Sequence, residues 1–430
     1  MSWACYSIQR CISNSVIVKY TNYETDTLKL AHFSIKEYLI SEHIQKHSQK
    51  QIAQFSLNEN LSHSLISQIC LAYLLQFNKL QLDENTMKSS PLAMYAAKEW
   101  IFHIKSCNND KSESASLLAL MLKLFTLNHM VFVNWIKIWD IDKENFETNC
   151  IKIFNGNHAG PLYYASMAGL NDIVCNLLEN GADVNMRKGL LGSALQAASY
   201  KGHEATVKLL LENGADVNAR GGIYETALEA ASFKGHLAAV KLLLKNGADV
   251  NITGGRGVGS ALHGAAQYGD ETVVKLLLIK VADVNFTGGP YGQALQAAAH
   301  GNHKSIVDLL IKEGADVNMQ GGEYGNALQT ASFLGHETIV KLLLKEGADV
   351  NVQGGKYGNA LQAASVEGNK AIVELLLEEG ADVDAQGGKY GHALQAASFH
   401  GNEAIVKLLL EKGAGVNAQR QRYEMHSKQC

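Results

Sequence analysis

One glycine-rich run has the composition of a loop that could hold phosphate groups. Gly254-Gly-Arg-Gly-Val-Gly-Ser260 offers closely spaced backbone amides that could surround an anion. A dinucleotide-binding loop must follow a buried strand and open a long helix, and a P-loop also needs a lysine that is absent here. The pattern therefore favours a structural loop, and we expect no nucleotide or other cofactor.

A short acidic run raises the question of a calcium site. Asp140-Ile-Asp142-Lys-Glu144 has the spacing of the first calcium ligands, but Asn145 stands where the loop needs glycine, and Ile151 where it needs glutamate. We interpret this run as a solvated turn.

Histidines could bind a metal or act as acids and bases, but their spacing does not favour either role. His203, His236 and His336 each follow a glycine at a repeated interval, so they do not converge on one site. Four others lack zinc-ligand spacing with cysteines or carboxylates: His300, His303, His392 and His400. We expect no metal.

Composition and cysteine usage exclude further classes of protein. The seven cysteines form no CxxC motif, which predicts reduced thiols, and none has an identifiable histidine partner for nucleophilic catalysis. Thirty-eight basic and 42 acidic residues give a net charge of −4, which provides no basic field for nucleic acid. No apolar run approaches the roughly 18 residues of a membrane span. We expect a cytoplasmic protein that is not an enzyme and binds neither nucleic acid nor membrane.

Two kinds of polypeptide meet near residue 155. All 39 glycines lie at Gly156 or later, whereas all four tryptophans lie in the first 150 residues. The second part is repetitive. Ala-Asp-Val-Asn begins at Ala182 and returns five times up to Ala348 in steps of 33 residues, with one step of 34, and near-copies follow at Ala381 and Ala414. A fixed period near 33 predicts a solenoid whose units bury a core by stacking.

The unit from Gly321 to Gln353 illustrates the predicted structure. Small residues in Ala327–Leu334 suit a short helix packed closely on its neighbours, and Gly335 ends it in a left-handed conformation. Glu337–Lys345 carries a broad apolar stripe typical of a buried second helix. The glycines after Gln353 predict a hairpin-like loop leading to the next unit. Asn302 replaces the helix-ending glycine in one unit, and asparagine also tolerates the left-handed conformation.

This pattern resembles the ankyrin repeat, in particular the variant common in fungi. There, x-Ala-Leu-Gln follows a Gly-Gly-x-Tyr-Gly loop, as in Gly321-Gly-Glu-Tyr-Gly-Asn-Ala-Leu-Gln329. The resemblance covers residues 156–419 and implies eight helix pairs, with a polar tail at 420–430. It also implies that the periodic histidines satisfy backbone groups, and that protein partners bind the concave surface.

The first 150 residues predict a compact, mostly helical block. Residues 15–21 and 27–32 alternate as in a β-hairpin, a helix is expected at 35–45, and further helices near 61–76, 91–106, 116–127 and 129–139. Because solenoid ends need a cap, we expect this block to cover the first repeat.

Part of this block resembles a segment of fungal NACHT-type, NOD-like receptors. Leu28-Lys-Leu-Ala-His-Phe-Ser-Ile-Lys-Glu-Tyr-Leu-Ile-Ser41 is similar to the end of the winged-helix region after their ATPase domain, and residues 69–77 and 90–104 are similar to the helical connector that follows it. The chain contains no GxxxxGK followed by Ser or Thr, so the NACHT domain is missing and the resemblance implies a truncated relative at residues 1–150.

Comparison between units separates the positions that stabilise the stack from those that could contact a partner. Positions identical in nearly every unit serve stacking, whereas variable positions at loop tips and first-helix ends are candidates for partner contact. The nearly constant loop tyrosines suit packing over the glycines, with partner contact as the alternative. The candidate partner-binding residues are Ile223, Tyr224, Phe233, Lys234, Tyr268, Tyr291, Glu323, Tyr324, Phe333, Lys356, Tyr357, Lys389, Tyr390, Phe399 and His400.

The sequence therefore predicts a mostly α-helical, non-enzymatic interaction scaffold, in which an ankyrin solenoid binds a protein partner on its concave face. The alternative is the sensor end of a NACHT-type receptor, active in signalling or self-nonself recognition.

Overall fold

The computed structural model describes residues 59–78, 90, 92–107, 111–127, 129–140, 159–254 and 259–416. The hairpin expected at 15–32, the helix at 35–45, the acidic run beyond Asp140 and the tail at 420–430 lie outside these ranges. The chain divides into two compact units. One comprises Met1–Pro161 with Cys175–Leu177, and the other comprises the remaining residues.

The described part of the first unit is helical, as the sequence predicts. Its core is aromatic: the rings of Trp100 and Trp135 meet edge to face at 5.5 Å, and the indole Nε1 of Trp135 donates to the carbonyl of Ala97 at 3.0 Å. Both tryptophans are buried, so they join helices that lie far apart in the sequence. The helices are α5 (Glu59–Leu74), α7 (Ala93–Lys105), α8 (Lys111–Leu122), the π-helical turn η1 (Lys123–Leu127) and α9 (His129–Ile138).

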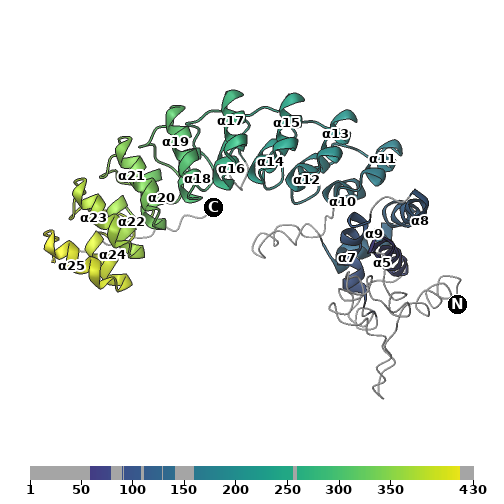
Figure 1. The fold of residues 1–430 in the computed structure, drawn as a ribbon, viewed down its shortest axis with the longest axis horizontal. Helices are drawn as coiled ribbons and strands as arrows, with labels where there is room; N and C mark the ends of the chain where they lie inside the picture. Colours follow the sequence, from purple (N-terminus) through teal and green to yellow (C-terminus); the bar gives the residue numbers. More distant parts are fainter. Residues whose placement is uncertain are drawn as a thin grey trace, which may run out of the picture. The chain divides into compact units, whose positions relative to one another are not determined.

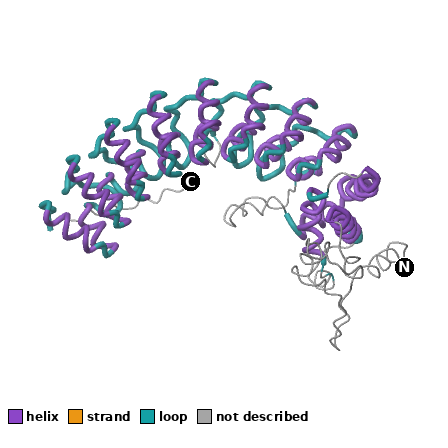
Figure 2. Tube along the Cα trace, viewed as in Figure 1, coloured by secondary structure: helices purple, strands orange, loops and turns teal. Residues whose placement is uncertain are grey.

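The second unit consists of eight helix pairs that stack in sequence order along an arc (Figures 1 and 2). The shorter first helices lie on the inner side of the arc, and the second helices lie on the outer side (Figure 1). The pairs are α10 (Pro161–Ala168) and α11 (Asn171–Glu179), α12 (Ala194–Lys201) and α13 (Glu204–Glu212), α14 (Ala227–Phe233) and α15 (Leu237–Lys245), α16 (Ala261–Tyr268) and α17 (Glu271–Ile279), α18 (Ala294–His300) and α19 (Lys304–Lys312), α20 (Ala327–Leu334) and α21 (Glu337–Lys345), α22 (Ala360–Glu367) and α23 (Lys370–Glu378), and α24 (Ala393–His400) and α25 (Glu403–Glu411).

The sixth pair confirms the predicted unit in detail. Helices α20 and α21 have the predicted bounds, and Gly335 between them has a φ of +78°. Asn302 adopts the same left-handed conformation in the fifth unit, with a φ of +60°. Hairpins join the units, and within the described residues their strands form only isolated bridges, such as Gly354 with Gly358.

In four units, a buried glutamine in the first helix links its own hairpin to the next one. Gln329 Oε1 accepts from the backbone amide of Asn326 at 2.7 Å, which completes a capping box with the side chain of Asn326. Its Nε2 donates to the carbonyl of Gly358 in the following hairpin at 2.9 Å. This double role explains why x-Ala-Leu-Gln recurs. The same two bonds occur at Gln196, Gln296 and Gln362.

The asparagine of Ala-Asp-Val-Asn forms a second link between units. Asn318 Nδ2 donates to the carbonyl of Gly347 at 3.2 Å, and its Oδ1 accepts from the amide of Asp349 at 2.7 Å. The carboxylate of Asp349 in turn accepts from the amide of Asn351, which closes a local turn. Asp384 replaces the asparagine in the seventh unit and accepts from Gly415. The paired bonds recur at Asn185, Asn218, Asn251, Asn285 and Asn351.

The hairpin tips approach one another so closely that glycine is required. A Cβ on Gly355 would lie 2.3 Å from the backbone of Tyr324, and Gly355 has a φ of +61°. This approach allows the amide of Lys356 to donate to Glu323 O, and that of Lys389 to Lys356 O, both at 2.9 Å. The tips of neighbouring units are therefore held in a continuous row.

The fourth unit departs from the pattern after its second helix. Val281 has a φ of +63° at the position where the other units have glycine, and 78% of its surface is exposed. A β-branched residue in this conformation is strained because its Cβ approaches the following carbonyl. The other units carry Gly181, Gly214, Gly247, Gly314, Gly347, Gly380 and Gly413 at this position.

Replacing Gln329 with leucine should lower the free energy of unfolding by about 2 kcal/mol, because it leaves the buried amide of Asn326 without its acceptor and removes the donor to the carbonyls of Val352 and Gly358. The carbonyl of Gly358 keeps its second bond, from the amide of Gly354. Urea unfolding measures the loss. The matched control is Gln320→Leu, since Gln320 donates to Gln353 O at an exposed site, and this change should cost less than about 0.5 kcal/mol. Equal losses in both variants would contradict the role given to the buried glutamine.

Replacing Val281 with glycine should raise the free energy of unfolding by about 1 kcal/mol, because the left-handed strain disappears and the exposed side chain contributes little packing. The reciprocal variant is Gly347→Val. A Cβ there would meet no atom within 4 Å, so its cost isolates the backbone conformation. A Val281→Gly protein that is less stable than the parent would show that this valine is not strained.

Candidate partner-binding surface

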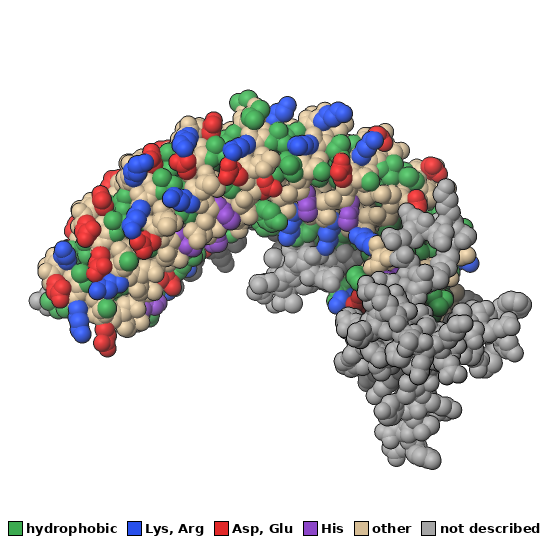
Figure 3. All heavy atoms as spheres, in the orientation of Figure 1, with side chains coloured by type: hydrophobic (Ala, Val, Ile, Leu, Met, Phe, Trp, Pro, Cys, Tyr) green, Lys and Arg blue, Asp and Glu red, His purple; other side chains and the backbone are tan. Residues whose placement is uncertain are grey.

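The predicted recognition positions lie in the hairpins that join the units and at the ends of the first helices, the helices on the inner side of the arc (Figure 1). We call this region the inner surface; it comprises the hairpin tips and the last residues of the first helices. Figure 3 shows a row of histidine side chains along the inner edge of the arc. Six of the predicted residues are exposed: Tyr268, Glu323, Lys356, Lys389, Phe399 and His400. Seven are half-buried: Ile223, Phe233, Lys234, Tyr291, Tyr324, Phe333 and Tyr390.

The other two predicted residues are buried. Tyr224 and Tyr357 expose 5% and 8% of their surface. Tyr357 stacks on Phe333 at 4.5 Å, and Tyr224 stacks on Tyr200 at 5.3 Å. Burial is the main cause that raises the pKa of the Tyr224 phenol, so it stays protonated. These rings therefore support the inner surface from beneath, which fits the packing role that the sequence suggested.

Lysines on the inner surface lie over aromatic rings. Lys389 Nζ is 5.1 Å from the ring centre of Tyr390, and Lys356 Nζ is 5.5 Å from that of Tyr357. Lys356 also pairs with Glu323 on the neighbouring tip at 2.6 Å. Hydrogen bonding to that carboxylate raises the pKa of Lys356. On this surface, the charged groups of Glu323, Lys356 and Lys389 thus stay exposed to solvent, and the two lysines lie over tyrosine rings.

The periodic histidines hydrogen-bond backbone groups of the preceding unit. The Nε2 of His203 donates to the carbonyl of Met167 and that of His236 to the carbonyl of Tyr200, both at 3.0 Å. His336 is hydrogen-bonded to the backbone of His300. His303, one period before His336, makes the same kind of bond to the carbonyl of Gln267 at 3.0 Å. Asn369 and Asn402 make the same kind of bond in the seventh and eighth units. Burial is the main cause that lowers the pKa of His236, and the neutral ring that this favours still donates from Nε2 to the carbonyl.

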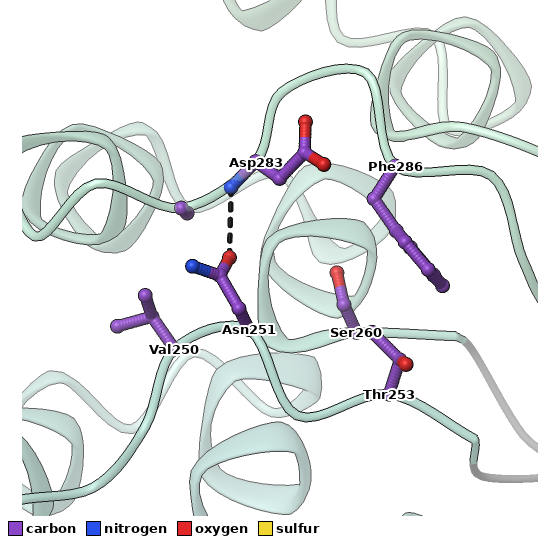
Figure 4. A pocket seen from close by; sticks show the side chains of 7 residues that line it. Val250, Asn251, Thr253, Ser260, Asp283 and Phe286 are labelled. Atoms are coloured by element: carbon purple, nitrogen blue, oxygen red, sulfur yellow. Dashed lines mark hydrogen bonds between the residues drawn. The ribbon is translucent and has the colours of Figure 1, made fainter.

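A small cavity lies between the third and fourth units (Figure 4). Its volume is about 220 Å³, which is below the roughly 300 Å³ at which ligand pockets begin. The neighbouring glycine-rich run is described only up to Gly254 and from Gly259. The cavity is lined by Val250, Asn251, Thr253, Ser260, Ala282, Asp283 and Phe286.

The described ranges also bear on metal binding and on membrane insertion. There, no group of three His, Cys, Asp or Glu side chains could hold a metal ion. No single helix among them is both long and apolar enough to cross a membrane. One pair bent by 92°, residues 115–125 with 130–138, meets these criteria together, by length and composition only.

The family model for ankyrin repeats matches residues 162–254, 262–354 and 351–420, which is more than half of the chain. The chain belongs to the ankyrin-repeat family.

Two further similarities accompany the ankyrin match. The azaphilone pigments biosynthesis cluster protein L of Monascus ruber is 37% identical over 186 residues, which are 41% of this chain and 38% of that relative. The chain thus matches well under half of the relative's length. The crystal structure of the human ASB11 ankyrin repeat domain is 27% identical, with a TM-score of 0.46, and the match covers 52% of this chain and 99% of that domain.

One buried histidine of the ankyrin array was not singled out from the sequence. His263 occupies the position of the bridging glutamine: its Nδ1 pairs with Ser260 Oγ at 2.7 Å, and its Nε2 with the carbonyl of Gly292 at 3.1 Å. Because that carbonyl can only accept, Nε2 donates and Nδ1 accepts from the serine. Comparing the x-Ala-Leu-Gln segments unit by unit would have found this residue.

His263 should make the stability of the array fall in mild acid. Burial is the main cause that lowers its pKa from 6.5 to about 4. Between these values the unfolded chain binds a proton that the folded chain does not, so stability is lost as the pH falls from about 6.5 towards 4. The loss from this residue at pH 5 is about 2 kcal/mol.

Urea unfolding at pH 7.5 and pH 5 checks this expectation in the parent and in His263→Gln. Glutamine stands at the same position in five other units, so the variant keeps a side chain that the fold accepts. Burial also lowers the pKa of His236, His300 and His336, so both proteins should lose stability in acid, but the parent should lose more. Identical losses would refute the assignment to His263.

Proposed function

We propose that this chain is a non-catalytic interaction scaffold and that the inner surface of its ankyrin array binds a protein partner. The observation that carries the proposal is that constant and variable positions of the unit have different roles. Constant polar residues such as Gln329 and Asn318 serve the links between units, whereas the variable positions expose rings and charges. Tyr268 and Phe399 expose 54% and 69% of their surface.

The exposed aromatic residues and the extended surface of the array favour a protein as the ligand. Exposed aromatic residues are over-represented among the anchors of protein interfaces, and repeat arrays present extended surfaces suited to such partners. One buried titratable group of the array, His263, has a structural explanation in the bridge that it makes to Gly292. A cytoplasmic location forms part of the same proposal.

The test compares two triple variants of the full chain. The inner variant carries Tyr268→Ser, Lys356→Glu and Phe399→Ser; the outer variant carries Lys241→Glu, Ile279→Ser and Leu410→Ser. All six residues are exposed, so both variants should fold like the parent, which circular dichroism and urea unfolding check. The probes are linear peptides selected from a phage-displayed random library on the parent protein, with binding measured by fluorescence anisotropy.

The proposal expects the inner variant to lose affinity for most selected peptides by at least about tenfold, and the outer variant to keep it. Peptides that bind the inner variant as well as the parent, or that lose affinity for the outer variant instead, would contradict a partner-binding inner surface.

The alternative function is that of the sensor end of a NACHT-type receptor. It rests on the resemblance of residues 28–41 and of the segments that overlap α5 and α7 to the receptor connector. Mapping the 5′ end of the transcript tests it. An upstream in-frame segment encoding GxxxxGK followed by Ser or Thr would support the receptor, and a start at Met1 would oppose it.

A further inference from the structure

The inner surface is not uniform in charge from one unit to the next. Near its N-terminal end, the rings of Tyr200, Tyr224 and Phe233 form a continuous stack, with successive centres 5.3 and 5.0 Å apart. Lys234 Nζ lies over two of these rings, 4.9 Å from the centre of Tyr200 and 5.4 Å from that of Phe233. Lys201 Nζ lies 5.9 Å from the centre of Tyr200. Two lysine ammonium groups from neighbouring units thus lie over the same ring, that of Tyr200.

An exposed tyrosine lies beside Gly235, the residue that follows Lys234. The ring of Tyr268 covers Gly235: its Cε1 lies 2.3 Å from where a Cβ on that glycine would stand. We call Tyr200, Lys201, Phe233, Lys234 and Tyr268 together the Lys234 patch.

The charge of Lys234 is not offset within the described part of the chain, where no carboxylate forms an ion pair with it. The carboxylate of Asp270 lies beside Gly235, but it accepts from the amides of Thr272 and Val273 and caps α17. His236, which also faces Lys234, has a pKa lowered mainly by burial. The charge of Lys234 is therefore not paired with a carboxylate of the described residues.

The corresponding positions near the C-terminal end serve as an internal comparison. Phe333 and Tyr357 form a similar stack there, but Val366 and Glu367 replace Phe233 and Lys234, and Lys356 is paired with Glu323. The carboxylates of that end balance its lysines. The same architecture thus carries a cationic surface at one end and a balanced one at the other, so the charge is not a requirement of the fold.

We propose that the Lys234 patch binds an acidic, extended segment of a partner protein, a refinement that rests on the proposed function. A lysine held over aromatic rings keeps its N–H groups for carboxylates, and it gives up little side-chain entropy on binding because its position is already restricted. Neighbouring units present Lys201 and Lys234 side by side, which suits carboxylates spaced along an extended chain. The exposed ring of Tyr268 adds an apolar contact.

The test uses the full chain and the peptides selected from the random library. Lys234→Glu reverses the charge and gives the unit the residue that the seventh unit carries at this position, so the fold should accept it. Lys241→Glu makes the same change on an exposed position of the outer helix α15 and is the matched control. Glu367→Lys makes the reverse change at the C-terminal end.

The proposal expects the selected peptides to be net acidic and to bind Lys234→Glu at least about tenfold more weakly than the parent, with the loss shrinking as salt is raised. Lys241→Glu and Glu367→Lys should not weaken binding. Peptides that are neutral or basic, or that bind Lys234→Glu unchanged, would overturn it.

The same measurements separate this inference from the broader function. If the inner triple variant loses the peptides while Lys234→Glu keeps them, the partner uses the inner surface without the charge of Lys234, and only the acidic-segment inference fails. If neither variant loses them, both proposals fail.

Discussion

The side-chain hydrogen bonds that pass from each unit to the next are the interaction on which the second unit depends. A helix pair of this size cannot bury a core alone, so its stability comes from stacking, and stacking needs a defined register. Asn318 supplies that register by binding the next unit through both its donor and its acceptor. Gln329 supplies it differently: its Nε2 donates to carbonyls of the next hairpin, while its Oε1 accepts from the buried amide of Asn326 at the start of its own helix.

This arrangement frees other positions to vary. Because the links use buried residues of the first helix and the turn after the second helix, the hairpin tips and first-helix ends can change from unit to unit without loss of register. Glu323, Lys356 and Lys389 occupy equivalent tips, yet their backbones continue the same row of hydrogen bonds. The inner surface is thus a constant backbone with variable side chains, which is the property that a recognition surface requires.

Much of this structure could be predicted from the sequence, because its causes are local. The period, the bounds of α20 and α21, and the left-handed Asn302 follow from helix patterning and backbone conformation. The packing of Tyr224 was suggested by the near-constancy of the loop tyrosines, but the position of Lys234 over the rings of Tyr200 and Phe233 could not be predicted, since it depends on contacts between units. The role of His263 was also missed, because histidine at a glutamine position signals a bridge only once the neighbouring carbonyl is known.

Hydrogen exchange tests the linking role of the asparagines most directly. The backbone amides of Asp316 and Asp349 lie in exposed turns, where amides ordinarily exchange fast, but they donate to Asn285 and Asn318 of the preceding units at 2.8 and 2.7 Å. We predict that these amides exchange at least about a hundredfold more slowly than in an unstructured peptide, and that Asn318→Ala releases Asp349 while leaving Asp316 protected. Exchange of both amides at the unstructured rate in the parent protein would contradict the account.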